Sequence, residues 1–185
     1  MSESRVASRY AKPLLELAQE RGVLEEVHAD MLLLTRTVSE HRDLKLALKN
    51  PIIKNDKKLM ILDKVFGSRI HPMTANIFRI ISQKNRENIL EDVAREFEHQ
   101  YNELKGIQVA HVTTATPLSP QLRADFAQVL ADQTGKTVDL KEHVDPEVIG
   151  GYVLRVGDRQ LDDSVRNSLR RLRNEFKENP YIPKI

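Results

Sequence analysis

The chain has 185 residues, is 40% hydrophobic and 30% charged, and contains no cysteine, which excludes disulfide frameworks and cysteine-based zinc sites. Residues 1–105 carry 18 Lys and Arg against 16 Asp and Glu, and residues 106–185 carry 11 of each, so neither half has the basic excess typical of nucleic-acid-binding proteins. No stretch reaches the roughly 20 apolar residues of a membrane-spanning helix and no secretory signal is recognisable, so we expect the protein to stay in the compartment where it is made.

The spacing of the apolar residues changes near Gly106. Up to about Lys105 they recur at helical spacing, and beyond it the period shortens towards two. We therefore predict a mainly α-helical protein with a small α/β part. An N-terminal six-helix bundle would occupy residues 1–105, and a C-terminal α/β domain with a small sheet and two helices would occupy residues 106–185.

Six segments of the first domain have helical spacing and recognisable ends. Gly22 stops the first helix, Pro51 follows the third, and Pro72 suits the opening turn of the fifth. The predicted segments run from about Ser4 to Arg21, Leu24 to Val38, Leu44 to Leu48, Asn55 or Asp56 (as cap) to Gly67, Pro72 to Gln83, and Glu87 to Leu104.

The second domain opens with a predicted inner strand from Ile107, in which both alternating sets are apolar or β-branched, as in a strand covered on both faces. A helix capped by Ser119 and stopped by Gly135 follows. Its predicted inward stripe is Leu122, Phe126, Val129 and Leu130.

The rest of the second domain is predicted to contain two more strands, a hairpin and a final helix. Val138 to Val144 and Ile149 to Val156 are the strands, and Gly157-Asp158 is a two-residue loop that leads to a short return strand. The final helix, about Ser164 to Lys177, is expected to bury Val165, Leu169, Leu172 and Phe176. The proline-containing tail from Asn179 is predicted to be extended.

The first and fifth helices carry more apolar surface than one buried face requires. At about 100° per residue their apolar residues cover arcs of roughly 160–180° and 160°, against about 100° for a helix with one buried face. Two interpretations stay open: both helices are central in the bundle, or one flank of each lines a groove for a guest amphipathic helix. In the second interpretation the small residues Ala7, Ala11 and Ala18 permit close approach, with Tyr10 and Leu14 as anchors.

Motifs that could carry chemistry are weak. Gly135-Lys136-Thr137 resembles the end of a phosphate loop, but it ends a helix instead of beginning one. Gly150-Gly151 lies within a strand pattern, where close packing is favoured over phosphate binding. The six histidines have no metal-ligand spacing. We therefore expect no catalytic residue, no metal and no cofactor.

The final helix is locally basic. Arg166, Arg170 and Arg173 share a face. This face is either solvated, complementing the negative helix end, or a docking surface for an acidic partner or RNA. The strands offer few aromatic residues for base stacking, so RNA is the weaker choice.

Two motifs resemble the delta subunit family of F-type ATP synthase, which includes the mitochondrial oligomycin sensitivity-conferring protein. The first motif is Ala7-x-x-Tyr10-Ala11-x-x-Leu14 in the opening helix. The second, more specific motif is Asp145-Pro146-x-x-Ile149-Gly150-Gly151-x-x-Leu154-Arg155-Val156-Gly157-Asp158-x-x-x-Asp162-x-Ser164-Val165, followed by Leu169 and Leu172. Asp163 departs mildly from the family, where a small residue is common. The resemblance covers nearly the whole chain.

The resemblance implies a non-catalytic stator subunit of the peripheral stalk. It implies that the N-terminal bundle holds the N-terminal helix of an alpha subunit of the catalytic head, in a groove between the first and fifth helices. Carried over by position, and together with the small residues of the first helix, the groove candidates are Ala7, Tyr10, Ala11, Leu14, Ala18, Ala75 and Phe78.

The C-terminal domain is implied to bind the end of the b-subunit dimer. Val165, Leu169 and Leu172 are the candidate contacts, with a purely core role as the alternative, and Gly150, Gly151, Gly157 and Asp158 are assigned to turns and packing. The implied location is the cytoplasmic face of the bacterial inner membrane, held there through the complex. An RNA- or ribosome-associated adaptor is the alternative function, and the near-zero charge of both halves argues against it.

Overall fold

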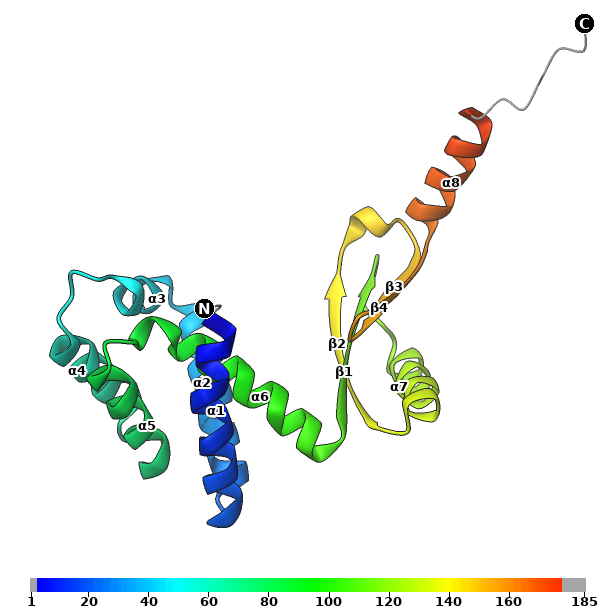
Figure 1. The fold of residues 1–185 in the computed structure, drawn as a ribbon. Coiled ribbons are helices and arrows are strands. Elements are labelled where there is room, and N and C mark those ends of the chain that lie inside the picture. Colours follow the sequence, from blue (N-terminus) through cyan, green and yellow to red (C-terminus); the bar gives the residue numbers. More distant parts are fainter. Residues whose placement is uncertain (1–2, 178–185) are drawn as a thin grey trace, which may run out of the picture. The chain divides into compact units, whose positions relative to one another are not determined.

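The computed structural model describes residues 3–177, so the predicted extended tail from Asn179 lies outside the described residues. Contacts divide the chain into two units, Met1–Leu104 and Lys105–Ile185. The first unit is helical and the second contains a four-stranded sheet, so the protein is mainly α-helical with a small α/β part (Figure 1).

Each of the six segments predicted to be helical in the first unit contains an α-helix. The elements in chain order are α1 (Glu3–Glu20), α2 (Leu24–Glu40), α3 (Arg42–Lys49), α4 (Asn55–Phe66), α5 (Pro72–Gln83), the 3-10 helix η1 (Glu87–Ile89) and α6 (Leu90–Lys105).

The core of the helical unit is built from large apolar side chains of its amphipathic helices. Phe66 of α4 and Phe78 of α5 meet edge to face, with their ring centroids 6.1 Å apart. Burying a side chain of this size stabilises the fold by about 1.5–3 kcal/mol. The largest fully buried apolar side chains of this unit are Phe66, Phe97, Met31, Leu34, Leu62, Ile81 and Leu90.

The start of α4 corrects the sequence prediction. Lys54 is the residue before the helix and makes no side-chain capping hydrogen bond, whereas Asn55 and Asp56 lie inside the first turn. The Asn55 amide donates to the side chain of Asn85 instead. The expected cap is therefore wrong, because both candidates lie within the helix.

Residues distant in sequence also fix the start of α5. The backbone N–H of His71 and the Thr74 hydroxyl both donate to Oδ2 of the buried Asp30 on α2, at 2.8 and 2.6 Å. His71 itself caps the helix by accepting from the N–H of Met73 at 3.2 Å. Asp30 thus ties α2 to the opening turn of α5.

The second unit has a mixed sheet. Its elements are β1 (Ile107–Thr114), α7 (Pro120–Thr134), β2 (Thr137–Val144), the 3-10 helix η2 (Pro146–Val148), β3 (Gly151–Val156), β4 (Arg159–Ser164) and α8 (Val165–Lys177). The strand order is β2-β1-β3-β4, and β1 is an inner strand as predicted. β1 and β2 are parallel through the α7 crossover, whereas β1–β3 and β3–β4 are antiparallel.

α7 covers one face of the sheet. Phe126 packs edge to face on Tyr152 of β3, with centroids 5.0 Å apart, and Arg123 pairs with Glu142 of β2 at 2.5 Å. The predicted inward stripe is only half right, because Leu130 is buried while Leu122 and Val129 remain 50% and 54% exposed.

Burial of β1 on both faces, expected from its two apolar sets, is not found. Ala110, Val112 and Thr114 are buried, whereas His111, which points to the opposite face, is exposed. A helix layer on only one face of the sheet is therefore enough to explain the one-sided burial of β1 within its unit.

Candidate functional site

α1 has a buried face and a partly exposed apolar flank. Ala7, Ala11 and Ala18 are completely buried, and Leu14 is 4% exposed. These four candidates therefore pack inside the helical unit instead of lying open at its surface. Their part in binding a guest helix stays a prediction.

The exposed apolar flank of α1 consists of other residues. Val6 and Tyr10 are half-buried, Pro13 is exposed, and Leu17 is 39% exposed. At about 100° per residue the four lie within an arc of roughly 60°, beside the buried alanines. We call Val6, Tyr10, Pro13 and Leu17 the α1 flank. Sequence periodicity placed Val6 and Leu17 in the apolar arc but could not tell which edge stays open.

The α1 flank is adjacent to the end of α5. α1 contacts both α5 and η1, and the Tyr10 hydroxyl accepts a hydrogen bond from Nη1 of Arg86 at 3.3 Å. On α5, Phe78 is 3% exposed, Ala75 is half-buried and Ile80 is 47% exposed. The structure thus brings the two predicted helices together, with Tyr10 and Ala75 accessible and Phe78 in the core.

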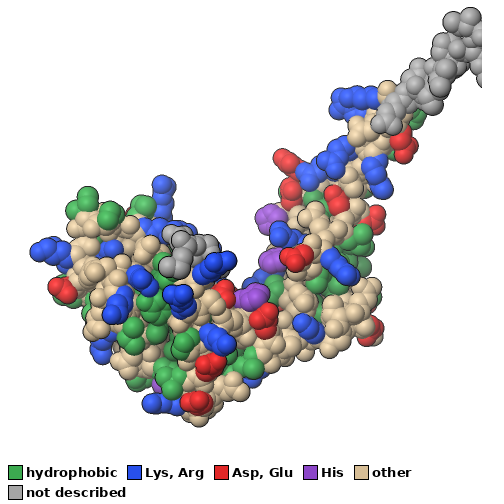
Figure 2. Space-filling model, viewed as in Figure 1, with side chains coloured by type: hydrophobic (Ala, Val, Ile, Leu, Met, Phe, Trp, Pro, Cys, Tyr) green, Lys and Arg blue, Asp and Glu red, His purple; other side chains and the backbone are tan. Residues whose placement is uncertain are grey.

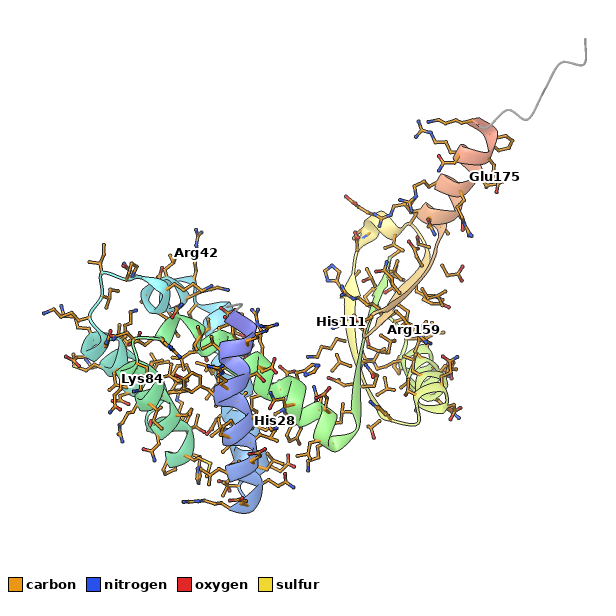
Figure 3. The ribbon with its side chains drawn as sticks, viewed as in Figure 1. His28, Arg42, Lys84, His111, Arg159 and Glu175 are labelled. Atoms are coloured by element: carbon orange, nitrogen blue, oxygen red, sulfur yellow. The ribbon has the colours of Figure 1, made fainter. Side chains whose placement is uncertain are left out.

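α8 contradicts the expectation of a buried final helix. None of its residues is buried, and Val165, Leu169, Leu172 and Phe176 are 41%, 53%, 48% and 86% exposed. A core role for the first three residues is therefore wrong. We call these four residues the α8 stripe. Side chains project from all around this helix in Figure 3, where Glu175 is labelled.

Basic side chains make up much of the rest of the α8 surface. Lys and Arg side chains gather along this helix in Figure 2. Arg166 pairs with Glu147 at 3.3 Å, and Arg170 donates to Asn167 at 3.0 Å. An exposed apolar stripe with flanking cations is suited to bind an amphipathic partner.

A compact turn fixes the start of α8. The buried Ser164 hydroxyl accepts from the Asn167 N–H at 3.1 Å and donates to Asp162 Oδ1 at 2.6 Å. The hydroxyl and the backbone N–H of Ser164, helped by the charges of Arg166 and Arg170, lower the pKa of Asp162 below its usual value. The first turn of α8 is thus fixed to the sheet although its outer surface is free.

The glycines of the second motif have packing roles. Gly151 has φ +72°, and a Cβ there would lie 2.2 Å from the carbonyl oxygen of Asp163. A Cβ on Gly150 would lie 3.2 Å from Cγ2 of Val165. Gly157, with φ +56°, and Asp158 form the hairpin loop between β3 and β4. Close packing is therefore the role of the Gly150-Gly151 pair.

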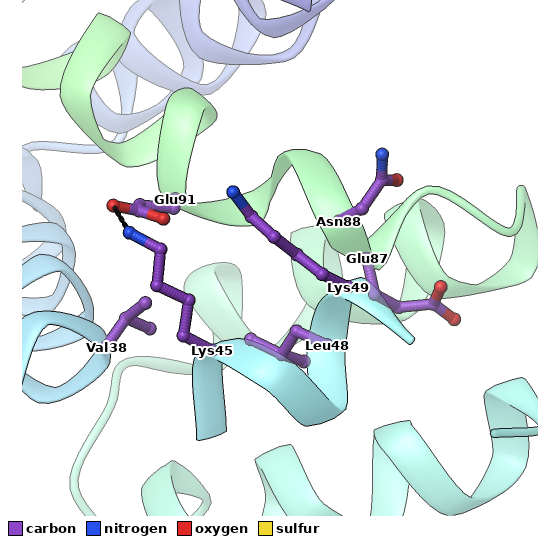
Figure 4. A pocket seen from close by; sticks show the side chains of 7 residues that line it. All are labelled: Val38, Lys45, Leu48, Lys49, Glu87, Asn88 and Glu91. Carbon is purple, nitrogen blue, oxygen red and sulfur yellow. Dashed lines mark hydrogen bonds and ion pairs between the residues drawn. The ribbon is translucent and has the colours of Figure 1, made fainter. Parts of the chain in front are cut away.

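The described residues offer little for catalysis or metal binding. Within residues 3–177 no three His, Asp or Glu side chains gather as a metal site. Gly135, at φ +66°, ends α7, so Gly135-Lys136-Thr137 does not open a helix as a phosphate loop does. The pocket in Figure 4, where Lys45 pairs with Glu91 at 3.0 Å, leaves ≈ 10 Å³, which is roughly the room one water needs.

Comparison with known proteins decides the family. The family model "ATP synthase delta (OSCP) subunit" matches residues 6–176. The chain belongs to this family. ATP synthase subunit delta of Cytophaga hutchinsonii is 39% identical over 178 residues, covering 96% of this chain and 97% of that protein. The corresponding subunit of Christiangramia forsetii is 40% identical over 185 residues, covering 100% of both chains.

A solved structure agrees in fold. A chain of the Toxoplasma gondii mitochondrial ATP synthase hexamer superposes with a TM-score of 0.72 at 25% identity, covering 94% of this chain and 98% of that chain. The protein is therefore a peripheral-stalk subunit of ATP synthase with a structural and not a catalytic role. In residues 3–177 no helix combines the length and apolar character that crossing a membrane requires.

Proposed function

We propose that this subunit ties the catalytic head to the membrane proton channel by binding an alpha subunit through its helical unit and the b-subunit dimer through its α/β unit. The six N-terminal helices act together as one bundle in this role. The single observation that carries the proposal is that each unit has a run of exposed or half-buried apolar side chains along a helix, the α1 flank in the first unit and the α8 stripe in the second. A connector needs two such surfaces, whereas an enzyme needs convergent polar groups.

The mechanical requirement explains why these surfaces are apolar. Rotary torque turns the head together with its rotor unless a stator holds the head to the membrane sector. A durable tie needs slow dissociation, and apolar burial contributes about 25 cal/mol per Å², part of which is offset by the cost of association. A subunit held in this way is peripheral, and we place it at the cytoplasmic face of the bacterial inner membrane.

The alpha-subunit end of the proposal uses the α1 flank and the accessible part of α5. The N-terminal helix of an alpha subunit packs its apolar face against Tyr10 and Leu17 on α1 and against Ala75 on α5. The buried residues Ala7, Ala11, Leu14, Ala18 and Phe78 support this groove from beneath by holding the two helices in place.

Calorimetric titration of the full chain with a peptide copying the N-terminal helix of its own alpha subunit tests this end. We expect one-to-one binding that Leu17→Asp weakens at least tenfold. The matched control is Leu32→Asp on α2, because Leu32 is 41% exposed and Leu17 39%. A bulky substitution such as Ala11→Trp would not test binding alone, because Ala11 is 0% exposed and a large side chain there would disturb the core.

A coupling measurement tests the whole proposal. Without the subunit, ATP hydrolysis by the free head should continue while ATP-driven proton pumping is lost. Full coupling in membranes that lack the subunit would refute the stator role. Equal weakening of peptide binding by Leu17→Asp and Leu32→Asp would instead remove only the assigned groove.

A further inference from the structure

A second accessible surface lies in the helical unit, away from the α1 flank. The C-terminal half of α2, the start of α3, the end of α4 and the segment after α4 border an open cleft of ≈ 560 Å³. Its apolar floor is formed by the half-buried Leu33 and Val65 and by Leu44, which is 9% exposed. We call this surface the basic cleft.

The rim of the basic cleft is positively charged. Arg36, Lys64 and Arg69 line the cleft together with a single carboxylate, Glu40, which Arg36 already binds at 2.7 Å. Lys64 and Arg69 form no ion pair with any residue that the structure describes. With three cations and one carboxylate, the rim has a net charge of +2. Residues 1–105 as a whole, with 18 Lys and Arg against 16 Asp and Glu, also have a net charge of +2.

We propose that the basic cleft binds an acidic, amphipathic segment of another subunit of the same complex. The apolar side chains of this segment contact Leu33, Leu44 and Val65, and its carboxylates pair with Lys64 and Arg69. The proposal rests on the stator function, because it assumes a partner within the ATP synthase assembly. It adds a docking surface separate from the α1 flank and the α8 stripe.

The exposure of the rim favours a polypeptide over a small anion. The side chain of Arg36 is 76% exposed, so a small ligand would stay in water, where a single ion pair contributes little. A segment of a larger protein covers the rim and adds apolar burial on the floor. The competing explanation is that Lys64 and Arg69 only offset the negative C-terminal end of α4, which requires no partner.

Site-directed photocrosslinking distinguishes the two explanations. The chain has no cysteine, so Thr37→Cys in the cleft accepts a benzophenone label at one position. Labelled full-length chain is assembled into ATP synthase from which the native subunit has been removed. We expect a crosslink to a partner segment that carries acidic beside apolar residues. A label at Lys57→Cys, an exposed position of α4 outside the cleft, measures the background crosslinking. If Thr37→Cys misfolds, Val65→Cys takes its place.

Neutralising the rim supplies the second readout. The double variant Lys64→Gln, Arg69→Gln should lower the crosslink yield roughly three- to tenfold. The matched pair Lys54→Gln, Lys57→Gln removes the same charge at the opposite end of α4 and should leave the yield unchanged.

Four outcomes would overturn the proposal. The first is a crosslink yield at Thr37→Cys no higher than at Lys57→Cys, and the second is a crosslink to a segment without acidic residues or to a second copy of this chain. The third is an equal effect of the two double variants on the yield. The fourth is binding of inorganic pyrophosphate that depends on the rim residues, without any crosslink to a partner. A label at Pro13→Cys, an exposed position of the α1 flank that is not one of the assigned contacts, tells this failure from failure of the proposed function. If position 13 crosslinks to an alpha subunit and position 37 crosslinks to no partner, only the cleft is wrong.

Discussion

Lys58 on α4 and Glu87 in η1 form an ion pair inside the helical unit, with Nζ and Oε2 3.5 Å apart and side chains 7% and 2% exposed. The Ser82 hydroxyl on α5 also donates to Oε1 of Glu87 at 2.8 Å. The pair therefore joins α4, α5 and η1 at one point, in the unit proposed to hold the head. Removing one partner of such a pair is costly, because the other charge stays buried without compensation.

We predict that Lys58→Met lowers the free energy of unfolding by about 3–5 kcal/mol. Lys57→Met, at the exposed neighbouring position, should change it by less than about 0.5 kcal/mol. Urea denaturation of both variants gives the comparison. The double variant Lys58→Met, Glu87→Met should recover much of the stability that Lys58→Met loses. Equal losses in Lys58→Met and Lys57→Met would contradict a buried pair.

Tyr101 gives the helical unit a specific response to alkaline pH. Its hydroxyl donates to Oε2 of Glu25 at 2.6 Å, and its ring stacks on His28 with centroids 3.7 Å apart. The hydrogen bond to Glu25, then burial, then the Glu25 charge raise the pKa of Tyr101 to about 12. The unfolded chain has a tyrosine pKa of about 10.

Because the folded state holds this proton more tightly, the stabilisation is complete below pH ~10 and is lost as pH rises towards ~12. We predict a loss of about 3 kcal/mol in unfolding free energy over this interval, and Tyr101→Phe should remove this contribution. Denaturation at several pH values measures it. Tyr152→Phe serves as the control and should show the same alkaline loss as the unchanged chain.

Gly151 and Gly157 both have positive φ but differ in their surroundings. A Cβ at Gly151 would collide with the Asp163 carbonyl, whereas at Gly157 it would meet no atom within 4 Å. We predict that Gly157→Ala costs about 1 kcal/mol of unfolding free energy from backbone strain alone, and that Gly151→Ala costs distinctly more. Thermal unfolding ranks the two variants, and equal costs would show that the strand accommodates the Cβ.

The α8 stripe predicts separable effects on stability and binding. Leu169→Asp should change the unfolding free energy by less than about 0.5 kcal/mol, because Leu169 is 53% exposed. It should weaken binding to a soluble b-subunit dimer fragment at least tenfold in a calorimetric titration. Leu122→Asp on α7, which is 50% exposed, is the matched control. Loss of stability without loss of binding would remove the stripe as the contact.

Local sequence signals predicted features that depend on neighbouring residues. Ser119 accepts from the N–H of Leu122 at 3.2 Å and caps α7, Gly135 ends it, and Gly157-Asp158 forms the hairpin loop, all as expected. Local signals failed at Asn55, which bonds to Asn85, thirty positions away. The Lys58–Glu87 pair had no sequence signal, since no spacing rule links residues of two different elements.

The sequence by itself determined the order and ends of most elements, the change from helix to mixed sheet near Gly106, and the family, because these depend on local backbone preferences, periodicity and motifs. Only the tertiary structure decided which apolar faces are covered. Both α1 and α8 carry an apolar face at helical spacing, yet Ala11 is 0% exposed and Leu169 is 53% exposed. The periodicity of apolar residues predicts that a helix has an apolar face. It does not predict whether that face packs within its own chain or binds a partner.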